Sequence, residues 1–135
     1  MLTRRGFAGC AICSAMGLVA SEVAAQAPAG EITRTLVQKN EFPGDRYETL
    51  LMNVGIPSNM LVPRHTHPGV ESTYVVEGGG ELSVKDQPTR SLHAGDGFQV
   101  PPVVPHSWKN GSQPTKLAIT YVVEKDKPLV TLVPE

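Results

Sequence analysis

The chain has 135 residues, a length that fits one domain. Hydrophobic residues make up 40% of it and charged residues 19%, and the formal net charge is −1, a balance that is ordinary for a globular protein and argues against a highly charged disordered chain. No basic patch stands out, so we expect no nucleic-acid partner.

The first 25 residues differ in composition from the rest of the chain. Arg4 and Arg5 precede Phe7 and an uncharged stretch that is too short and too weakly apolar to span a membrane. A basic start, a modest apolar region and small residues are typical of a secretory signal, and the paired arginines resemble a twin-arginine signal. We expect residues 1–25 to be cut off near Ala25 and the mature protein to be periplasmic or secreted. The alternative is a short N-terminal helix.

Both cysteines, Cys10 and Cys13, fall inside this signal segment, so the mature chain has no disulfide and no reactive thiol. Residues 26–31 are a short linker rich in alanine, proline and glycine, and residues 32–135 form the folded domain. A domain of this size buries only about two thirds of the surface of its chain. It therefore needs a well-filled core, a bound metal or a partner subunit.

Beyond the linker, the sequence predicts strands and no helix. No stretch keeps a 3.6-residue apolar period, whereas short β-rich runs alternate with turns rich in Gly, Pro, Asn and Asp. We interpret Gly78–Gly80 as a hairpin turn. Many short strands favour an all-β domain, a small jelly-roll β-barrel. The predicted strands are residues 32–37, 47–56, 60–67, 72–77, 81–85, 90–93, 97–100, 106–109, 116–124 and 129–133.

Two histidines and a glutamate stand close together where the third predicted strand ends. His65 and His67 are two residues apart, so in a strand they point to the same face. The turn at Pro68 then brings Glu71 within reach of both. A buried carboxylate without a partner costs several kcal/mol, and a divalent cation would remove that penalty. The alternative is a solvated surface pair of histidines beside an ordinary glutamate.

A second segment favours the metal site, because it supplies His106 after a Gly-Asp turn and a rigid proline-rich stretch. The two segments together resemble the two motifs of the cupin superfamily. In the first motif, three residues separate His67 from Glu71 and six separate Glu71 from Gly78. Gly95, Pro101, His106 and Asn110 fit the second motif. The resemblance is to small single-domain (type-2) cupins and covers about residues 52–121.

Two positions depart from the family pattern. Asn59 stands where the first motif begins with glycine, and asparagine also tolerates a left-handed backbone. Val103 stands where the second motif has glycine, and a β-branched side chain resists positive φ. We therefore expect the turn at Val103 to differ from that of the family. Neither departure replaces a ligand.

The resemblance implies a barrel with four metal ligands, His65, His67, Glu71 and His106, and one or two open coordination positions. This ligand set suits one divalent transition metal, and Mn, Fe, Ni, Cu and Zn all remain possible. Copper and zinc bind more tightly than manganese and iron in free competition. Because a twin-arginine signal exports folded protein, a weaker-binding metal can be loaded first in the cytoplasm. We therefore favour Mn or Fe.

Three residues are predicted to line a substrate pocket. Trp108 shares strand parity with His106, Leu61 shares it with His65, and Val75 shares it with Glu71. The alternative for Trp108 is that its side chain only fills the core. The fourth histidine, His93, has no partner at metal-ligand spacing and is interpreted as a plain exposed residue.

Two functions follow from these expectations. The first is a metal-dependent oxygenase of the dioxygenase type, or a related oxidoreductase, acting on a small organic molecule, with Glu71 as ligand and catalytic base. Lyase or isomerase chemistry, in which the metal polarises the substrate, is equally open. The second is a non-catalytic module that binds a metal or a small ligand in the periplasm. The family resemblance also implies a homodimer.

Overall fold

The computed structural model describes residues 30–134, which form ten strands. Within that range there is no helix, and hence none long and apolar enough to cross a membrane. The predicted signal segment and most of the linker lie outside the described residues. The strands are β1 (Thr33–Glu41), β2 (Tyr47–Ile56), β3 (Leu61–Thr66), β4 (Gly69–Glu77), β5 (Gly79–Val84), β6 (Arg90–His93), β7 (Gly97–Val100), β8 (His106–Asn110), β9 (Thr115–Glu124) and β10 (Thr131–Leu132).

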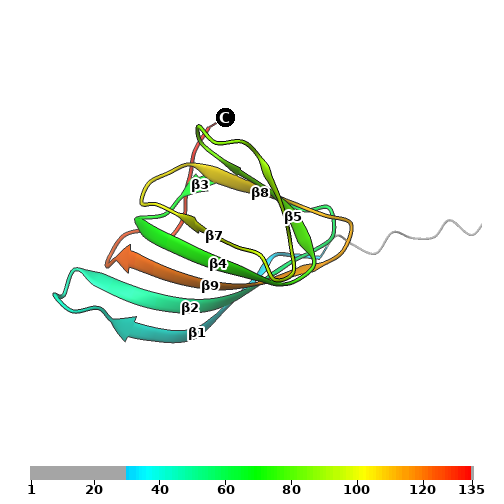
Figure 1. The fold of residues 1–135 in the computed structure, drawn as a ribbon. Helices are drawn as coiled ribbons and strands as arrows, with labels where there is room; N and C mark the ends of the chain where they lie inside the picture. The colour runs from blue at the N-terminus through cyan, green and yellow to red at the C-terminus, as the bar shows by residue number, and fades with distance from the viewer. Residues whose placement is uncertain (1–29, 135) are drawn as a thin grey trace, which may run out of the picture.

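The strands form two antiparallel sheets that enclose the interior (Figure 1). One sheet has the order β1-β2-β9-β4-β7 and the other β10-β3-β8-β5-β6. From β2 to β5 each successive strand lies in the opposite sheet, so that most neighbours within a sheet are distant in sequence. This confirms the all-β, jelly-roll prediction.

Alternation of apolar and polar residues decides which face of each strand is buried. On β2 and β9 every second side chain is buried, and each strand is paired to its neighbour along its full length. The apolar side chains between the sheets are the core that surrounds the site. β2 and β9 together supply Leu50, Met52, Val54, Ile56, Leu117, Ile119, Tyr121 and Val123.

The triple glycine was predicted as a hairpin turn, and this is wrong. β4 pairs with β7 and β9, whereas β5 pairs with β6 and β8, so Gly78 carries the chain from one sheet to the other. Gly78 has a φ of 78°, and Gly79 and Gly80 lie within β5. A Cβ on Gly80 would meet the Trp108 ring at 2.8 Å, so close packing requires glycine there.

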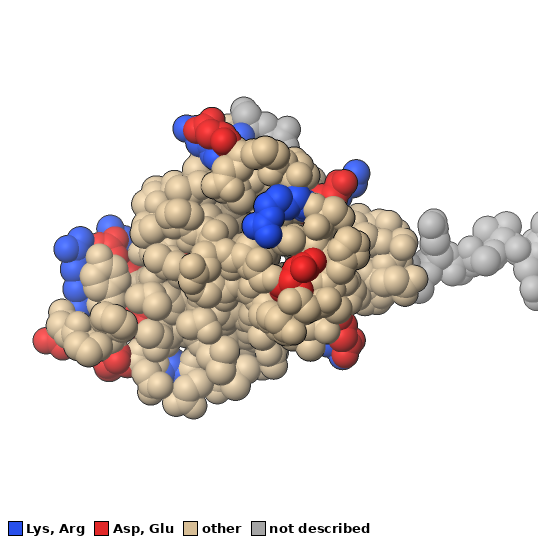
Figure 2. All heavy atoms as spheres, viewed as in Figure 1, with Lys and Arg blue, Asp and Glu red and all other residues tan. Residues whose placement is uncertain are grey.

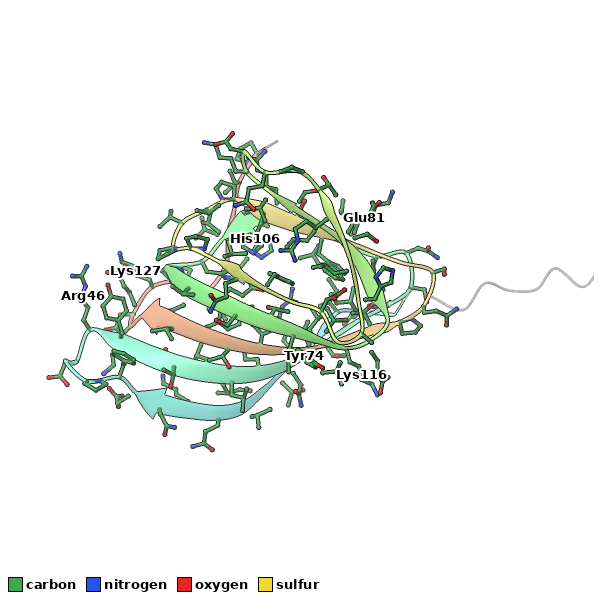
Figure 3. All side chains as sticks on the ribbon, in the orientation of Figure 1. Arg46, Tyr74, Glu81, His106, Lys116 and Lys127 are labelled. Carbon is green, nitrogen blue, oxygen red and sulfur yellow. The ribbon has the colours of Figure 1, made fainter. Side chains whose placement is uncertain are left out.

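On the face shown in Figure 2 charged side chains lie at the left end, at the top and on the right half, where a blue and a red group lie near the middle of the face. At one end Arg46 Nη2 lies 2.7 Å from Glu124 Oε1, and at the other Lys116 Nζ lies 3.0 Å from Glu77 Oε1. Such exposed pairs contribute little to stability. Figure 3 shows that Arg46 and Lys116 project outward, while His106 points between the sheets.

Candidate metal centre

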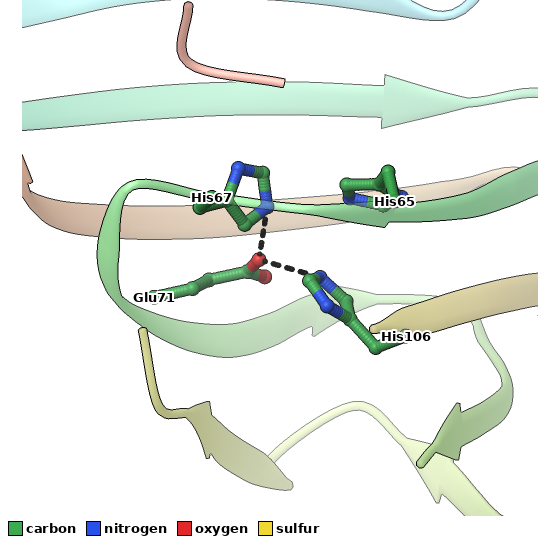
Figure 4. Close-up of side chains that lie close together, drawn as sticks. All are labelled: His65, His67, Glu71 and His106. Carbon is green, nitrogen blue, oxygen red and sulfur yellow. Dashed lines mark hydrogen bonds and ion pairs between the residues drawn. The ribbon is translucent and has the colours of Figure 1, made fainter. Parts of the chain in front are cut away.

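Four side chains from two sheets meet in the interior (Figure 4). His65, His67, Glu71 and His106 are all buried, and one nitrogen or oxygen of each lies within 4.8 Å of those of the others. The spacing in the sequence predicted that these four residues gather, and the structure places them together.

Strand pairing explains why they meet. His65 on β3 is paired directly with His106 on β8, so both imidazoles stand side by side on the inner face of one sheet. His67 follows the end of β3, and the chain then enters β4, where Glu71 is paired with Tyr121 of β9 and lies in the opposite sheet. The short β3–β4 connection therefore folds the glutamate over the histidines.

Each imidazole is oriented by a hydrogen bond from Nδ1 to a backbone carbonyl. The acceptors are Pro63 O for His65 at 2.7 Å, Leu129 O for His67 at 2.6 Å and Val104 O for His106 at 2.9 Å. A carbonyl only accepts, so Nδ1 carries the proton in each ring. In the neutral imidazole Nε2 is then a bare lone pair, the form that binds metals.

Two of the three Nε2 atoms, those of His67 and His106, face the same carboxylate oxygen at short distance. Glu71 Oε2 lies 2.8 Å from His67 Nε2 and 3.1 Å from His106 Nε2. His67 Nε2 is fully buried and, despite that short distance, makes no aligned hydrogen bond. Lone pairs this close repel one another unless a cation lies among them. The chemistry of the donor set therefore fits a divalent metal ion.

The ionisation of the buried groups agrees with this fit. Burial lowers the pKa of His65 to about 4, so the ring is neutral at pH 7. Burial alone would raise the pKa of Glu71, but hydrogen bonds with His106, His67 and Thr73 outweigh it and hold the pKa below its ordinary value. Thr73 Oγ1 donates to Glu71 Oε1 at 2.6 Å, which turns Oε2 toward the histidines.

A cavity of about 50 Å³ adjoins the four residues. It is close in size to one or two water molecules. Its wall is mostly apolar, and the side chains that exclude water include Val54, Ile56, Leu82, Phe98, Leu117 and Ile119. Only a small molecule, or one end of a larger one, fits inside.

Of the three predicted pocket residues, the structure places one on the cavity. Trp108 lines it and packs 6.2 Å from Phe98 between ring centroids. Val75 is fully buried in the core away from the lining. The parity argument for Leu61 is wrong, because β3 has a bulge between Val62 and His65 that reverses the faces. Leu61 is 53% exposed, and Val62 lines the cavity instead.

Two lining residues, Tyr121 and Arg34, escaped the sequence analysis. The ring of Tyr121 packs at a tilt of 58° against His67 with ring centroids 4.8 Å apart, and burial followed by the charge of Glu71 raises the pKa of Tyr121. Its alternation with Ile119 and Val123 on β9 was the available signal. Nothing in the sequence placed Arg34 near the histidines, because that depends on the pairing of β1 with β2.

The backbone at Val103 was expected to avoid positive φ, and this is wrong: its φ is 61°. Its N–H donates to the carbonyl of His67 at 3.0 Å, so the proline-rich loop is tied to a site residue despite the strain. Asn59 also has positive φ, 58°, as expected of asparagine. His93 is exposed and lies beside Asp96, outside the group of four.

Comparison with known proteins identifies a family for most of the folded part. The family described as "Cupin domain" matches residues 54–124, a span that contains all four site residues. No curated protein is significantly similar to the chain.

Solved structures share the fold at low identity. The DMSP lyase DddQ from Ruegeria pomeroyi DSS-3 is 20% identical with a TM-score of 0.65, over 76% of this chain and 51% of that one. The polyketide cyclase RemF from Streptomyces resistomycificus is 25% identical with a TM-score of 0.55, over 69% and 64%. A salicylate 1,2-dioxygenase from Pseudaminobacter salicylatoxidans is 22% identical with a TM-score of 0.51, over 54% and 20%. This chain thus spans about half the length of the lyase.

Proposed function

Because the chain belongs to the cupin family, we propose that it is a metal-dependent enzyme acting on a small organic molecule, most specifically an oxygenase or related oxidoreductase. The observation that carries this proposal is the convergence of three imidazoles and one carboxylate beside a small apolar cavity.

His65, His67, Glu71 and His106 would hold the metal. When bound, it supplies a Lewis acid with open positions for substrate and oxygen. The donor set accepts Mn, Fe, Ni, Cu or Zn, and loading before export favours Mn or Fe. The backbone carbonyls that accept from each Nδ1 keep the rings aimed at one point.

The surrounding residues support chemistry on a substrate in the cavity. Glu71 is ionised, and its Oε2 is the one carboxylate oxygen aimed into the site, so Glu71 is the proposed base. The raised pKa of Tyr121 keeps its hydroxyl protonated, so it can donate a hydrogen bond to a substrate oxygen. The apolar wall excludes water, which strengthens both interactions.

Lyase or isomerase chemistry is the second candidate, favoured by the structural likeness to a DMSP lyase and a polyketide cyclase. A non-catalytic binding module is the third. Oxygen uptake separates the first candidate from the other two. An oxygenase consumes O₂ with a substrate from a panel of small acids and phenols, whereas a lyase, an isomerase or a binding module consumes none.

Metal content tests the proposal that all three share. Protein purified from its native host should hold about one divalent ion per chain. His67→Ala should lose most of it and unfold at a lower temperature, because metal binding contributes to folding. His93→Ala is the matched control, since His93 is exposed and outside the site. Full occupancy in His67→Ala would refute the site.

Export is proposed on the first 25 residues alone. N-terminal sequencing of the protein from a periplasmic fraction should begin near Gln26. Protein found only in the cytoplasm with Met1 retained would overturn this.

A further inference from the structure

We propose that Arg34 selects anionic substrates, gripping a carboxylate at the mouth of the cavity while another part of the molecule faces the four-residue centre. This inference rests on the proposed function, because it assigns a substrate class to the same site. Among residues 30–134, Arg34 is the one lysine or arginine side chain that lines the cavity.

Strand pairing directs Arg34 inward. It is paired with Val54 on β2, and Val54 is paired with Leu117 on β9. Val54 and Leu117 are both buried and both line the cavity. Directly opposed residues share a face of the sheet, so the Arg34 side chain projects toward the cavity.

Arg34 lies at the opening of the cavity and not deep inside it. β1 is the edge strand of its sheet and all nine of its residues are exposed. Val130, 40% exposed, is the other largely exposed lining residue, and most of the remaining wall is buried. The opening therefore lies between β1 and the segment before β10, and a ligand entering there passes the guanidinium.

Within residues 30–134 no acidic side chain forms an ion pair with Arg34 and no side-chain hydrogen bond engages it. The other cations of β1 and its neighbours differ: Lys39 pairs with Glu48, and Arg46 pairs with Glu124. The five donors of Arg34 are thus available to a planar carboxylate, which guanidinium binds in a bidentate way.

The charge of the loaded site also favours an anion. Three neutral imidazoles, one carboxylate and a divalent ion carry a net charge of +1, and Arg34 adds another positive charge. Of the described residues that line the cavity, only Glu71 is acidic, so no other carboxylate among them compensates this charge. A ligand with one or two negative charges matches it, and a cationic ligand is repelled.

Fluorescence of Trp108 offers a direct test, because it is the single tryptophan and it lines the cavity. Succinate and glutarate are titrated into metal-containing protein, alongside succinamate, in which an amide replaces one carboxylate. We expect a dicarboxylate to bind more tightly than succinamate. Arg34→Gln should weaken dicarboxylate binding about tenfold or more and reduce the advantage of a dicarboxylate over succinamate, and Arg34→Lys should recover part of the loss.

Arg90→Gln is the matched control, because it removes the same charge from an exposed strand outside the cavity, and it should bind like the wild type. Metal content is measured on every variant. If metal is present and Arg34→Gln binds dicarboxylates as the wild type does, or the wild type binds neither, the inference is overturned while the proposed function stands. If the wild type holds no metal, the proposed function fails and the inference with it.

Discussion

At the scale of single residues, backbone atoms set the orientation of the imidazoles. The three carbonyls that accept from Nδ1 belong to Pro63 in β3 and to Val104 and Leu129 in the segments before β8 and β10, so the backbone fixes the direction of each Nε2. The carboxylate is instead oriented by a side chain, the hydroxyl of Thr73. Polar partners of this kind keep ligands in the geometry that the metal needs.

Thr73→Val tests that role. The change removes one hydroxyl at nearly constant shape, so Glu71 loses the donor that holds Oε1, and metal affinity should fall about 10–100-fold. Thr73→Ser retains a hydroxyl and should remain close to the wild type. Competition with a chromophoric chelator measures both. Equal affinity in Thr73→Val and the wild type would show that the hydroxyl does not orient the carboxylate.

Strain at Val103 leads to a second prediction at this scale. The left-handed backbone costs a β-branched residue about 1–2 kcal/mol, and glycine costs about 0.5–1 kcal/mol in chain entropy. The Val103 side chain is 66% exposed, so little packing is lost on its removal. Val103→Gly should therefore raise the free energy of unfolding by up to about 1 kcal/mol in urea denaturation.

Val76→Gly is the control for this change. Val76 is similarly exposed on β4 but has ordinary φ, so glycine there should destabilise the protein. A lower urea midpoint for Val103→Gly than for the wild type would mean that the loop bears no strain.

Spacing predicted that His65, His67 and Glu71 gather, because an i, i+2 pair and a nearby turn are local features, whereas His106 was added by the resemblance to the second cupin motif. The prediction that Leu61 lines the pocket was wrong because one extra residue in β3 reverses the faces of the strand, and strand parity alone cannot reveal a bulge. Arg34 was missed because its place depends on which strand β1 pairs with, a contact that no local pattern contains.

At the scale of the strands, close packing of β4 against β9 holds Glu71 in place. Gly69, the first residue of β4, is paired with Val123 of β9, and its backbone lies so close to β9 that a Cβ would stand 1.9 Å from the carbonyl oxygen of Val122. The strand therefore needs glycine there, for the approach of two backbones.

Gly69→Ala should push β4 away from β9 and displace Glu71, two residues further on. We expect a loss of about 1–3 kcal/mol or more in the free energy of unfolding, together with reduced metal occupancy. Gly97→Ala is the milder comparison, because its nearest neighbour would be Thr73 O at 3.1 Å. Thermal denaturation and metal analysis of the two variants check this; wild-type values for Gly69→Ala would contradict the packing argument.

Strand positions were largely predictable because turn residues and β-branched runs mark them locally. β2, β6 and β7 begin and end at the predicted residues, whereas β1 continues to Glu41 and β4 begins at Gly69. The role of the glycines after β4 was not predictable, because a turn within a sheet and a crossing between sheets use the same residue.

The whole molecule brings the site together through pairs that are distant in sequence. β3 pairs with β8 in one sheet and β4 pairs with β9 in the other, so His65 lies beside His106 and Glu71 beside Tyr121, and the two pairs face each other across the interior. The jelly-roll class was predictable from many short strands, and the resemblance of the two motifs pointed to the family. The opening between β1 and the segment before β10 was not predictable, since it depends on how completely one sheet covers the other.

The central claim is that one divalent ion lies among these four side chains. The most direct measurement is an anomalous difference map from a crystal of metal-containing protein, collected at the absorption edge of the metal. We predict one peak per chain, about 2.0–2.3 Å from Nε2 of His65, His67 and His106 and from an oxygen of Glu71. A peak elsewhere, or a His106 ring turned to bulk water in metal-containing protein, would contradict the account.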